Sequence, residues 1–152
     1  MMAQTRSMSV RDRMSRRVTT VRPEAHLSEA AKLMRARKIR HLPVVDRAGR
    51  LVGMVTARDL RQVLFAPIVQ DERADVQALL EALSVRDVMT RGVLSVRAAT
   101  PIRDAARLMH ERKLGALPVV ERDRLVGILT ESDVLRAFQE LLGPAASAVI
   151  PP

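Results

Sequence analysis

Apolar and polar positions along the chain change their spacing from one segment to the next. After an opening at residues 9–14, the β-branched residues of 18–21 predict a short extended segment. Four apolar residues then recur at helical spacing and predict a helix with one buried face: Leu27, Ala30, Ala31 and Met34. The first third of the chain therefore predicts an extended segment followed by an amphipathic helix.

A hairpin and a second helix are expected next. Two apolar runs, 42–45 and 51–55, enclose the polar turn 46–50, which is typical of a β-hairpin. A helix is then expected to open at Thr56 and to run through Leu64. The predicted order of this unit is β-α-β-β-α.

The same pattern occurs a second time. Residues 9–64 align with residues 84–138 after one deletion near Gly49, and nearly half of the aligned pairs are identical. In the second copy, Thr100 before Pro101 favours a helix start with a hydroxyl cap and a proline in the first turn. One copy is too small to cover both its sheet and its helices. We therefore expect a mixed α/β (α+β) fold in which two β-α-β-β-α repeats pack as a pseudo-two-fold pair.

The repeat also predicts the domain boundaries. The two domains are residues 9–64 and 84–138, and residues 65–83 connect them. The second half of this connection has good helix formers at helical spacing, so we expect an ordered helix there. Residues 1–8 and 143–152 are expected to be flexible tails.

Composition limits the class of protein. Of 152 residues, 47% are hydrophobic, as in a globular protein, and the only aromatic residues are Phe65 and Phe138, so the core must be aliphatic. The absence of cysteine excludes disulfides, a thiol nucleophile and a cysteine-bound metal, and it fits a reducing compartment, so we expect a cytoplasmic protein. The arginine-rich start does not resemble a signal peptide, and no run of 18 apolar residues suggests a membrane partner.

The charge is unusual. The formal net charge is +9, and only three of the 26 basic residues are lysines. Such a balance can indicate nucleic acid or phosphate-bearing ligands. However, no four basic residues are consecutive, and many arginines occupy the same place in both copies, for example Arg11 and Arg86. A structural role common to both copies explains this pairing better than a continuous binding surface does, so nucleic acid ranks last among the binding hypotheses.

No catalytic or metal-binding motif is found. The chain has no nucleophile elbow, no phosphate-binding glycine loop and no zinc-protease motif. His26, His41 and His110 are scattered, and no spacing brings them together with carboxylates. We therefore expect neither an enzyme nor a metal site.

One motif is retained in both copies. Residues 53–59 and 127–133 share the pattern glycine, two apolar residues, threonine, two residues, aspartate. Each predicts a strand that ends in a hydroxyl residue at a helix start, with a carboxylate three residues later. This arrangement suits helix capping. It equally suits a ribose, whose two hydroxyls a carboxylate can accept, and a phosphate at the helix start.

The repeat resembles the cystathionine-β-synthase (CBS) domain pair, also called a Bateman module. The resemblance rests on the tandem copy, on Leu-Pro-Val-Val at 42–45 and 117–120, and on the glycine-threonine-aspartate motif after each. It covers about residues 9–138. It implies a regulatory module that binds an adenosine-containing ligand, such as AMP, ADP, ATP or S-adenosylmethionine, in two clefts between the copies. No catalytic cofactor is implied.

The resemblance also implies the residues of each cleft. Aspartates 59 and 133 would hold ribose hydroxyls, the threonines would lie near ribose or phosphate, and apolar residues would enclose the adenine. One cleft would be formed by Asp133, Thr130, Ile128, Met14, Thr19 and Ile39. Its pseudo-symmetric mate would be formed by Asp59, Thr56, Met54, Met89, Leu94 and Leu114.

The two copies differ where phosphates are expected. Arg40 and His41 precede the first Leu-Pro-Val-Val, whereas Gly115 and Ala116 precede the second. Arg58 beside the first aspartate is likewise replaced by a serine in the second copy. We expect unequal sites, with Arg40 binding phosphate as a planar fork and His41 adding charge when protonated. Alternatively, both arginines are solvated surface groups and His41 is a half-buried strand residue.

The resemblance implies a stand-alone module that changes shape for an unknown regulated protein. Such pairs form homodimers through helices, and the apolar faces of the second helices could serve either a dimer or the core: Leu60, Val63, Leu64, Val134, Leu135 and Phe138. A ligand-free dimeric scaffold is the alternative, although the retention of both threonine-aspartate pairs argues against it. Nucleic-acid binding is the third hypothesis.

Overall fold

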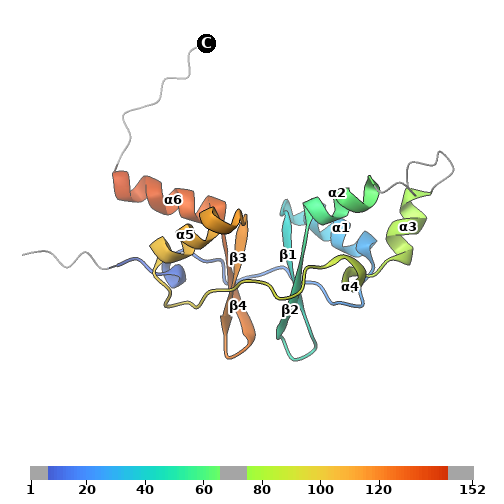
Figure 1. Ribbon diagram of the computed structural model, residues 1–152, viewed down its shortest axis with the longest axis horizontal. Helices are drawn as coiled ribbons and strands as arrows, with labels where there is room; N and C mark the ends of the chain where they lie inside the picture. The colour runs from blue at the N-terminus through green and yellow to red at the C-terminus, as the bar shows by residue number, and fades with distance from the viewer. Residues whose placement is uncertain (1–6, 66–74, 144–152) are drawn as a thin grey trace, which may run out of the picture.

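The computed structural model describes residues 7–65 and 75–143 and contains the two expected repeats, drawn side by side in Figure 1. The first repeat comprises α1 Leu27–Arg37, β1 His41–Val45, β2 Leu51–Thr56 and α2 Ala57–Leu64. The second comprises α5 Ile102–Arg112, β3 Ala116–Glu121, β4 Arg124–Thr130 and α6 Glu131–Leu142. The mixed α/β fold class and the two repeats are confirmed. The extended segment predicted at the start of each repeat is not a strand: Val21 and Val96 each form only an isolated parallel bridge, to Val44 and Val119. Helix α6 continues to Leu142, beyond the predicted end at residue 138.

The connection between the repeats is helical where it is described. Helix α3 Val76–Ala82 packs against α1, and Asp75 caps it by accepting hydrogen bonds from the amides of Gln77 and Ala78. Residues 66–74 of the connection lie outside the described residues, as do 1–6 and 144–152 of the expected tails. Met8, which we expected in the first tail, packs against the core of the second repeat.

The first helix of each repeat forms for the predicted reason and ends in the same way. Leu27, Ala30 and Met34 are buried on one face of α1. The helix stops at Lys38, which adopts the left-handed conformation with φ 52°, and Lys113 does so after α5 with φ 53°. The prediction that Thr100 caps α5 is wrong by one residue: Pro101 is the N-cap, and the Thr100 hydroxyl accepts a hydrogen bond from the Arg97 amide instead.

The opening segments are exchanged between the repeats. Residues Val10–Asp12 form a 3₁₀ helix, and Val10 is fully buried in the core of the second repeat. Conversely, helix α4 Val85–Val88 places the fully buried Val85 in the core of the first repeat. Figure 1 shows the blue opening segment beside α5 and α4 below α1. Each repeat therefore completes its core with a segment of the other.

Backbone hydrogen bonds hold each exchanged segment. The amide of Val10 donates to the Thr100 carbonyl oxygen at 2.8 Å, and the amide of Val85 donates to the Ala25 carbonyl oxygen at 2.8 Å. At the ends of the segments, Ser15 pairs with Ile128 on the edge of β4, and Thr90 pairs with Met54 on the edge of β2. Each hairpin thus gains a neighbour from the other half of the sequence.

A glycine in each hairpin permits this close approach. A Cβ atom on Gly53 would lie 2.7 Å from the Met89 Sδ and 3.0 Å from the Thr90 carbonyl oxygen. A Cβ atom on Gly127 would lie 2.7 Å from the Met14 Sδ and 3.0 Å from the Ser15 carbonyl oxygen. The thioether can shift, but the paired backbone has no room to do so. The two glycines of the repeated motif therefore have a packing role.

We expect Gly53→Ala and Gly127→Ala each to lower the free energy of unfolding by about 1–3 kcal/mol, because the added methyl group overpacks the contact between hairpin and opening segment. Chemical denaturation measures this loss, and Arg103→Ala, at an exposed position of α5, is the control. A change within about 0.5 kcal/mol in both glycine variants would show that the contact adapts without cost.

Candidate functional site

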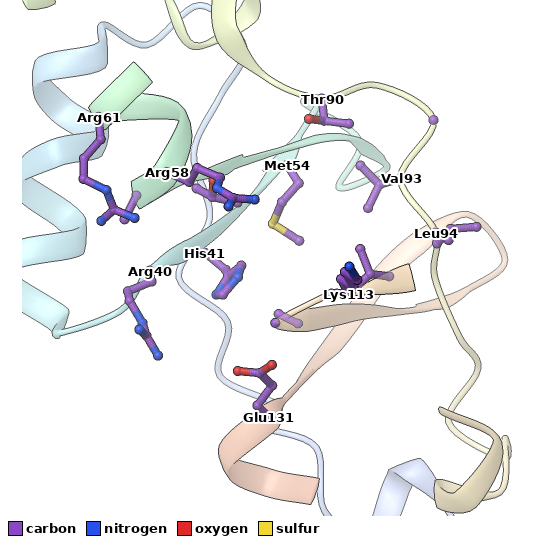
Figure 2. A pocket seen from close by; sticks show the side chains of 16 residues that line it. Arg40, His41, Met54, Arg58, Arg61, Thr90, Val93, Leu94, Lys113 and Glu131 are labelled. Atoms are coloured by element: carbon purple, nitrogen blue, oxygen red, sulfur yellow. The ribbon is translucent and has the colours of Figure 1, made fainter. Parts of the chain in front are cut away.

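A cavity of about 500 Å³ lies between the repeats, at the junction of β2 and α2. Its walls come from this junction, from the segment after α4, and from the end of α5 with the start of β3. Figure 2 shows Arg40, Arg58 and Arg61 entering from the first repeat and Lys113 and Glu131 from the second. We call it the first cleft. Its volume is in the range of small-molecule sites.

The first cleft contains most of the residues predicted for it. Met54, Thr56, Leu94 and Leu114 line its wall together with Arg58. Two predicted members are not among the lining residues. Met89 packs over Gly53 in the contact described above, and Asp59 is bonded to Thr56 at the start of α2.

A second cavity of about 320 Å³ occupies the pseudo-symmetric position. We call it the second cleft. Thr19, Ile39, Ile128 and Thr130 line it, as the resemblance to CBS pairs implied, whereas Asp133 is bonded to Thr130 at the start of α6 and is not a lining residue. Met14 packs over Gly127 instead, just as Met89 packs over Gly53. The two clefts are thus built from equivalent positions of the two repeats.

The threonine and aspartate of each motif form a helix cap. One oxygen of Asp59, Oδ2, accepts hydrogen bonds from the Thr56 amide at 2.8 Å and the Thr56 hydroxyl at 3.0 Å. Asp133 Oδ2 accepts the same pair from Thr130 at 2.8 and 2.9 Å. Within the described residues, Oδ1 of both aspartates accepts no side-chain hydrogen bond. Each carboxylate is therefore oriented by one oxygen while the other stays available.

Four residues line both clefts and form what we call the seam: Arg40, His41, Gly115 and Glu131. The pseudo-two-fold relation makes Gly115 the counterpart of Arg40, and Ala57 the counterpart of Glu131. Ala116, the counterpart of His41, lines the first cleft alone. The two repeats therefore supply different side chains to the seam.

His41 lies across the seam. Its imidazole packs on the second repeat so closely that a Cβ atom on Gly115 would lie 2.8 Å from Cε1 and 2.9 Å from Nε2. Burial lowers the pKa of His41, and the neighbouring Arg40 charge lowers that pKa further, against smaller opposing effects of Glu131 and Asp59. His41 is thus held mainly as the neutral imidazole at neutral pH.

Several cations of the clefts were missed by the sequence analysis. Arg61 and Lys113 line the first cleft, and Arg17 and Lys38 line the second. Arg61 follows Arg58 by three residues on α2, a spacing that places both on one face of the helix. Lys38 and Lys113 occupy equivalent positions at the ends of α1 and α5. This shared position in the repeat is the sequence feature from which both could have been predicted.

Other kinds of site find no support. Among residues 7–65 and 75–143, no three metal-binding side chains group closely enough to hold an ion. In the same part of the chain, no helix is long and apolar enough to cross a membrane. The site consists of the two clefts and their shared seam.

The family of the chain follows from comparison with known proteins. The CBS domain model matches residues 10–66 and 85–140, close to the two predicted domains 9–64 and 84–138. A CBS domain-containing protein of Dictyostelium discoideum is 33% identical over 136 residues, which cover 89% of this chain and 94% of that protein. The chain belongs to the CBS domain family, and its two repeats form a CBS domain pair.

Solved structures of similar proteins contain adenosine compounds. The structure of CBSX2 of Arabidopsis thaliana in complex with AMP has 34% identity and a TM-score of 0.74, covering 88% of this chain and 98% of the other. The CBS domain pair of protein MJ0100 in complex with 5′-methylthioadenosine and S-adenosyl-L-methionine has 30% identity and a TM-score of 0.72, covering 86% and 95%. These ligands belong to those proteins.

Some relatives carry a similar pair within a longer chain. A homoserine O-acetyltransferase of Methanococcoides burtonii is 36% identical over 129 residues, which are 84% of this chain but only 24% of that protein. The chain therefore spans about a quarter of such enzymes, and the matched part is the CBS module.

The buried His41 predicts a specific pH dependence. Because burial lowers the pKa of His41 from the usual histidine value of 6.5, the unfolded chain takes up a proton before the folded chain does as the pH falls. The free energy of unfolding of the wild type should therefore fall as the pH decreases from about 7.5 to 5.5, relative to His41→Gln. Thermal melts of both proteins across this range measure the difference.

His110→Gln, at an exposed position of α5, is the matched control. Comparison with this variant separates the effect of the seam position from that of removing a histidine elsewhere. If the wild type and His41→Gln keep a constant offset across the range, His41 is not held neutral by the fold.

Proposed function

We propose that this CBS pair is a regulatory module that binds an adenosine-containing ligand in each cleft and transmits its occupancy to a partner protein. The observation that carries the proposal is the pairing of two equivalent clefts, each lined by the motif threonine, apolar residues and cations, with the motif aspartate hydrogen-bonded to that threonine. AMP in CBSX2 and the two adenosine compounds in the pair of MJ0100 support the ligand class.

The base would be held by apolar residues. Met54, Val93, Leu94 and Leu114 line the first cleft from both repeats. Such side chains can bury the apolar faces of a flat aromatic ring. Because this contact is apolar, it discriminates little between rings of different charge. Ile39 and Ile128 would do the same in the second cleft.

The ribose would be held by the motif aspartates. In both, Oδ2 is engaged by the preceding threonine, which fixes the carboxylate at the start of the helix. Oδ1 would then accept the ribose hydroxyls as charge-assisted hydrogen bonds. A capping role and a ligand role are therefore compatible within one carboxylate.

A phosphate would be held by the cations that line each cleft. The first cleft offers Arg58, Arg61 and Lys113 in addition to Arg40, and the second offers Arg17 and Lys38. Arginine suits phosphate because its planar fork can donate two parallel hydrogen bonds. The ligands we propose are therefore AMP, ADP or ATP, with S-adenosylmethionine as the alternative.

The regulatory output would act through shape. Ligand between the repeats can change their arrangement only if two arrangements differ in ligand affinity. We further propose a homodimer formed through helices, since Leu135 and Phe138 of α6 are 62% and 56% exposed. The cysteine-free composition is our reason for placing the protein in the cytoplasm.

The ligand-free dimeric scaffold remains the second candidate. The exposed apolar face of α6 favours it, because such a face suits an interaction surface whether or not a ligand is bound. Nucleic-acid binding has no comparable observation in the described residues beyond the positive charge.

Calorimetric titration should show binding of AMP by the wild type, and Asp59→Asn and Asp133→Asn should each weaken one site by about 10- to 100-fold. The reason is that hydrogen bonds to a charged group contribute about 1.5–3 kcal/mol. Asp104→Asn, at an exposed position of α5, is the matched control and should bind as the wild type does.

A purely structural role of the aspartates gives a different result. Loss of the cap would then lower the melting temperature of Asp59→Asn and Asp133→Asn, while the AMP affinity measured well below that temperature would stay unchanged. If AMP, adenosine and S-adenosylmethionine all fail to bind the wild type, the scaffold hypothesis is favoured.

A further inference from the structure

We propose that Arg40 serves both clefts in turn, so that a phosphate held by Arg40 in one cleft weakens the binding of a second anionic ligand in the other. This inference rests on the proposed function, because it assumes adenosine ligands in both clefts. It adds a regulatory property, a penalty on double occupancy that applies to phosphorylated ligands and not to uncharged ones.

Arg40 is placed to reach both clefts. It follows α1, it lines both cavities, and its side chain is exposed. Its guanidinium forms no ion pair or side-chain hydrogen bond with the described residues, while its carbonyl oxygen accepts a hydrogen bond from the Ala57 amide at 2.9 Å. The backbone at Arg40 is thus anchored, and the charged end of the side chain is free to bind an anion on either side.

The second repeat cannot supply an equivalent arginine. The counterpart of Arg40 is Gly115, and the His41 ring occupies the space that a side chain there would need, with Cε1 2.8 Å from the position of a Cβ atom. A symmetric pair would provide one arginine for each cleft. At this position of the seam the chain provides one arginine for two clefts, and a guanidinium that forms a bidentate pair with one phosphate has lost that geometry for another.

The other groups of the seam do not replace it. Burial and the Arg40 charge lower the pKa of His41, so the imidazole is not a second cation at neutral pH. Glu131 lines both clefts, and its counterpart in the first repeat is Ala57, so its negative charge is also unmatched. Once a phosphate has neutralised Arg40, a second phosphate faces Glu131 without compensation at the seam.

The remaining cations set the order of filling. Arg58, Arg61 and Lys113 line only the first cleft, and Arg17 and Lys38 line only the second. The larger and more cationic first cleft is therefore the one that takes the first phosphorylated ligand together with Arg40.

Two matched variants allow the coupling to be measured. Leu94 lines only the first cleft, and its repeat counterpart Thr19 lines only the second. Leu94→Trp and Thr19→Trp would therefore each fill one cleft and leave the other open. Titration of these variants with AMP gives the two single-site binding constants, and titration with adenosine provides an uncharged ligand with the same base and sugar.

The overall constant for binding two AMP molecules to the wild type should be at least about tenfold smaller than the product of the two single-site constants, equivalent to about 1.4 kcal/mol of coupling. For adenosine the two quantities should agree. In Arg40→Ala the AMP difference should disappear, and in Arg103→Ala, a matched loss of an exposed arginine, it should remain.

Each other outcome has a definite meaning. Equality of the two AMP quantities in the wild type overturns the proposal, and so does a difference that persists in Arg40→Ala or that adenosine shows equally. Adenosine binding to the open cleft of each tryptophan variant shows that the variant is folded. If neither AMP nor adenosine binds the wild type, the coupling proposal is overturned; if ADP, ATP and S-adenosylmethionine also fail to bind, the proposed function is overturned with it.

Discussion

The exchange of the two opening segments is the contact on which the rest of this structure depends. Val10 is buried in the core of the second repeat and Val85 in the core of the first, so neither core is complete without a segment from the other half of the sequence. Burial of one valine side chain contributes about 1.5–3 kcal/mol. The segments continue as Ser15 and Thr90 along the hairpin edges, so the same exchange also pairs each hairpin with backbone from the other half of the sequence.

The clefts follow from this arrangement. Beyond the part that is buried in the core of the other repeat, each opening segment continues past the strand-helix junction of that repeat. The threonine-aspartate motif at this junction therefore lies beside residues from the other half of the sequence. Symmetry makes two such clefts, but the two repeats differ at the seam, where the counterpart of Arg40 is Gly115 and Glu131 has no acidic counterpart. Two clefts with nearly the same framework but an asymmetric seam are suited to binding two ligands with different affinities.

Much of the fold and of the clefts was predictable from the sequence, because the repeat presents the same pattern twice. The helices, the hairpins and most cleft residues were predicted from periodicity and from the resemblance to CBS pairs. The burial of Met14 and Met89 over glycines was not predictable, because it depends on a backbone contact between distant segments. Lys38 and Lys113 were missed because only charged residues that the two copies do not share, such as Arg40 and Arg58, were considered for phosphate, whereas these lysines stand at equivalent positions of the repeat.

Calorimetric unfolding of Val10→Ala and Val85→Ala tests the central claim, that exchange of the opening segments makes the two repeats one cooperative unit. Each substitution removes core contacts from one repeat only. The account predicts a single transition at a lower melting temperature in both variants, with equal calorimetric and van't Hoff enthalpies. Two transitions, of which only the one belonging to the altered core is shifted, would contradict it.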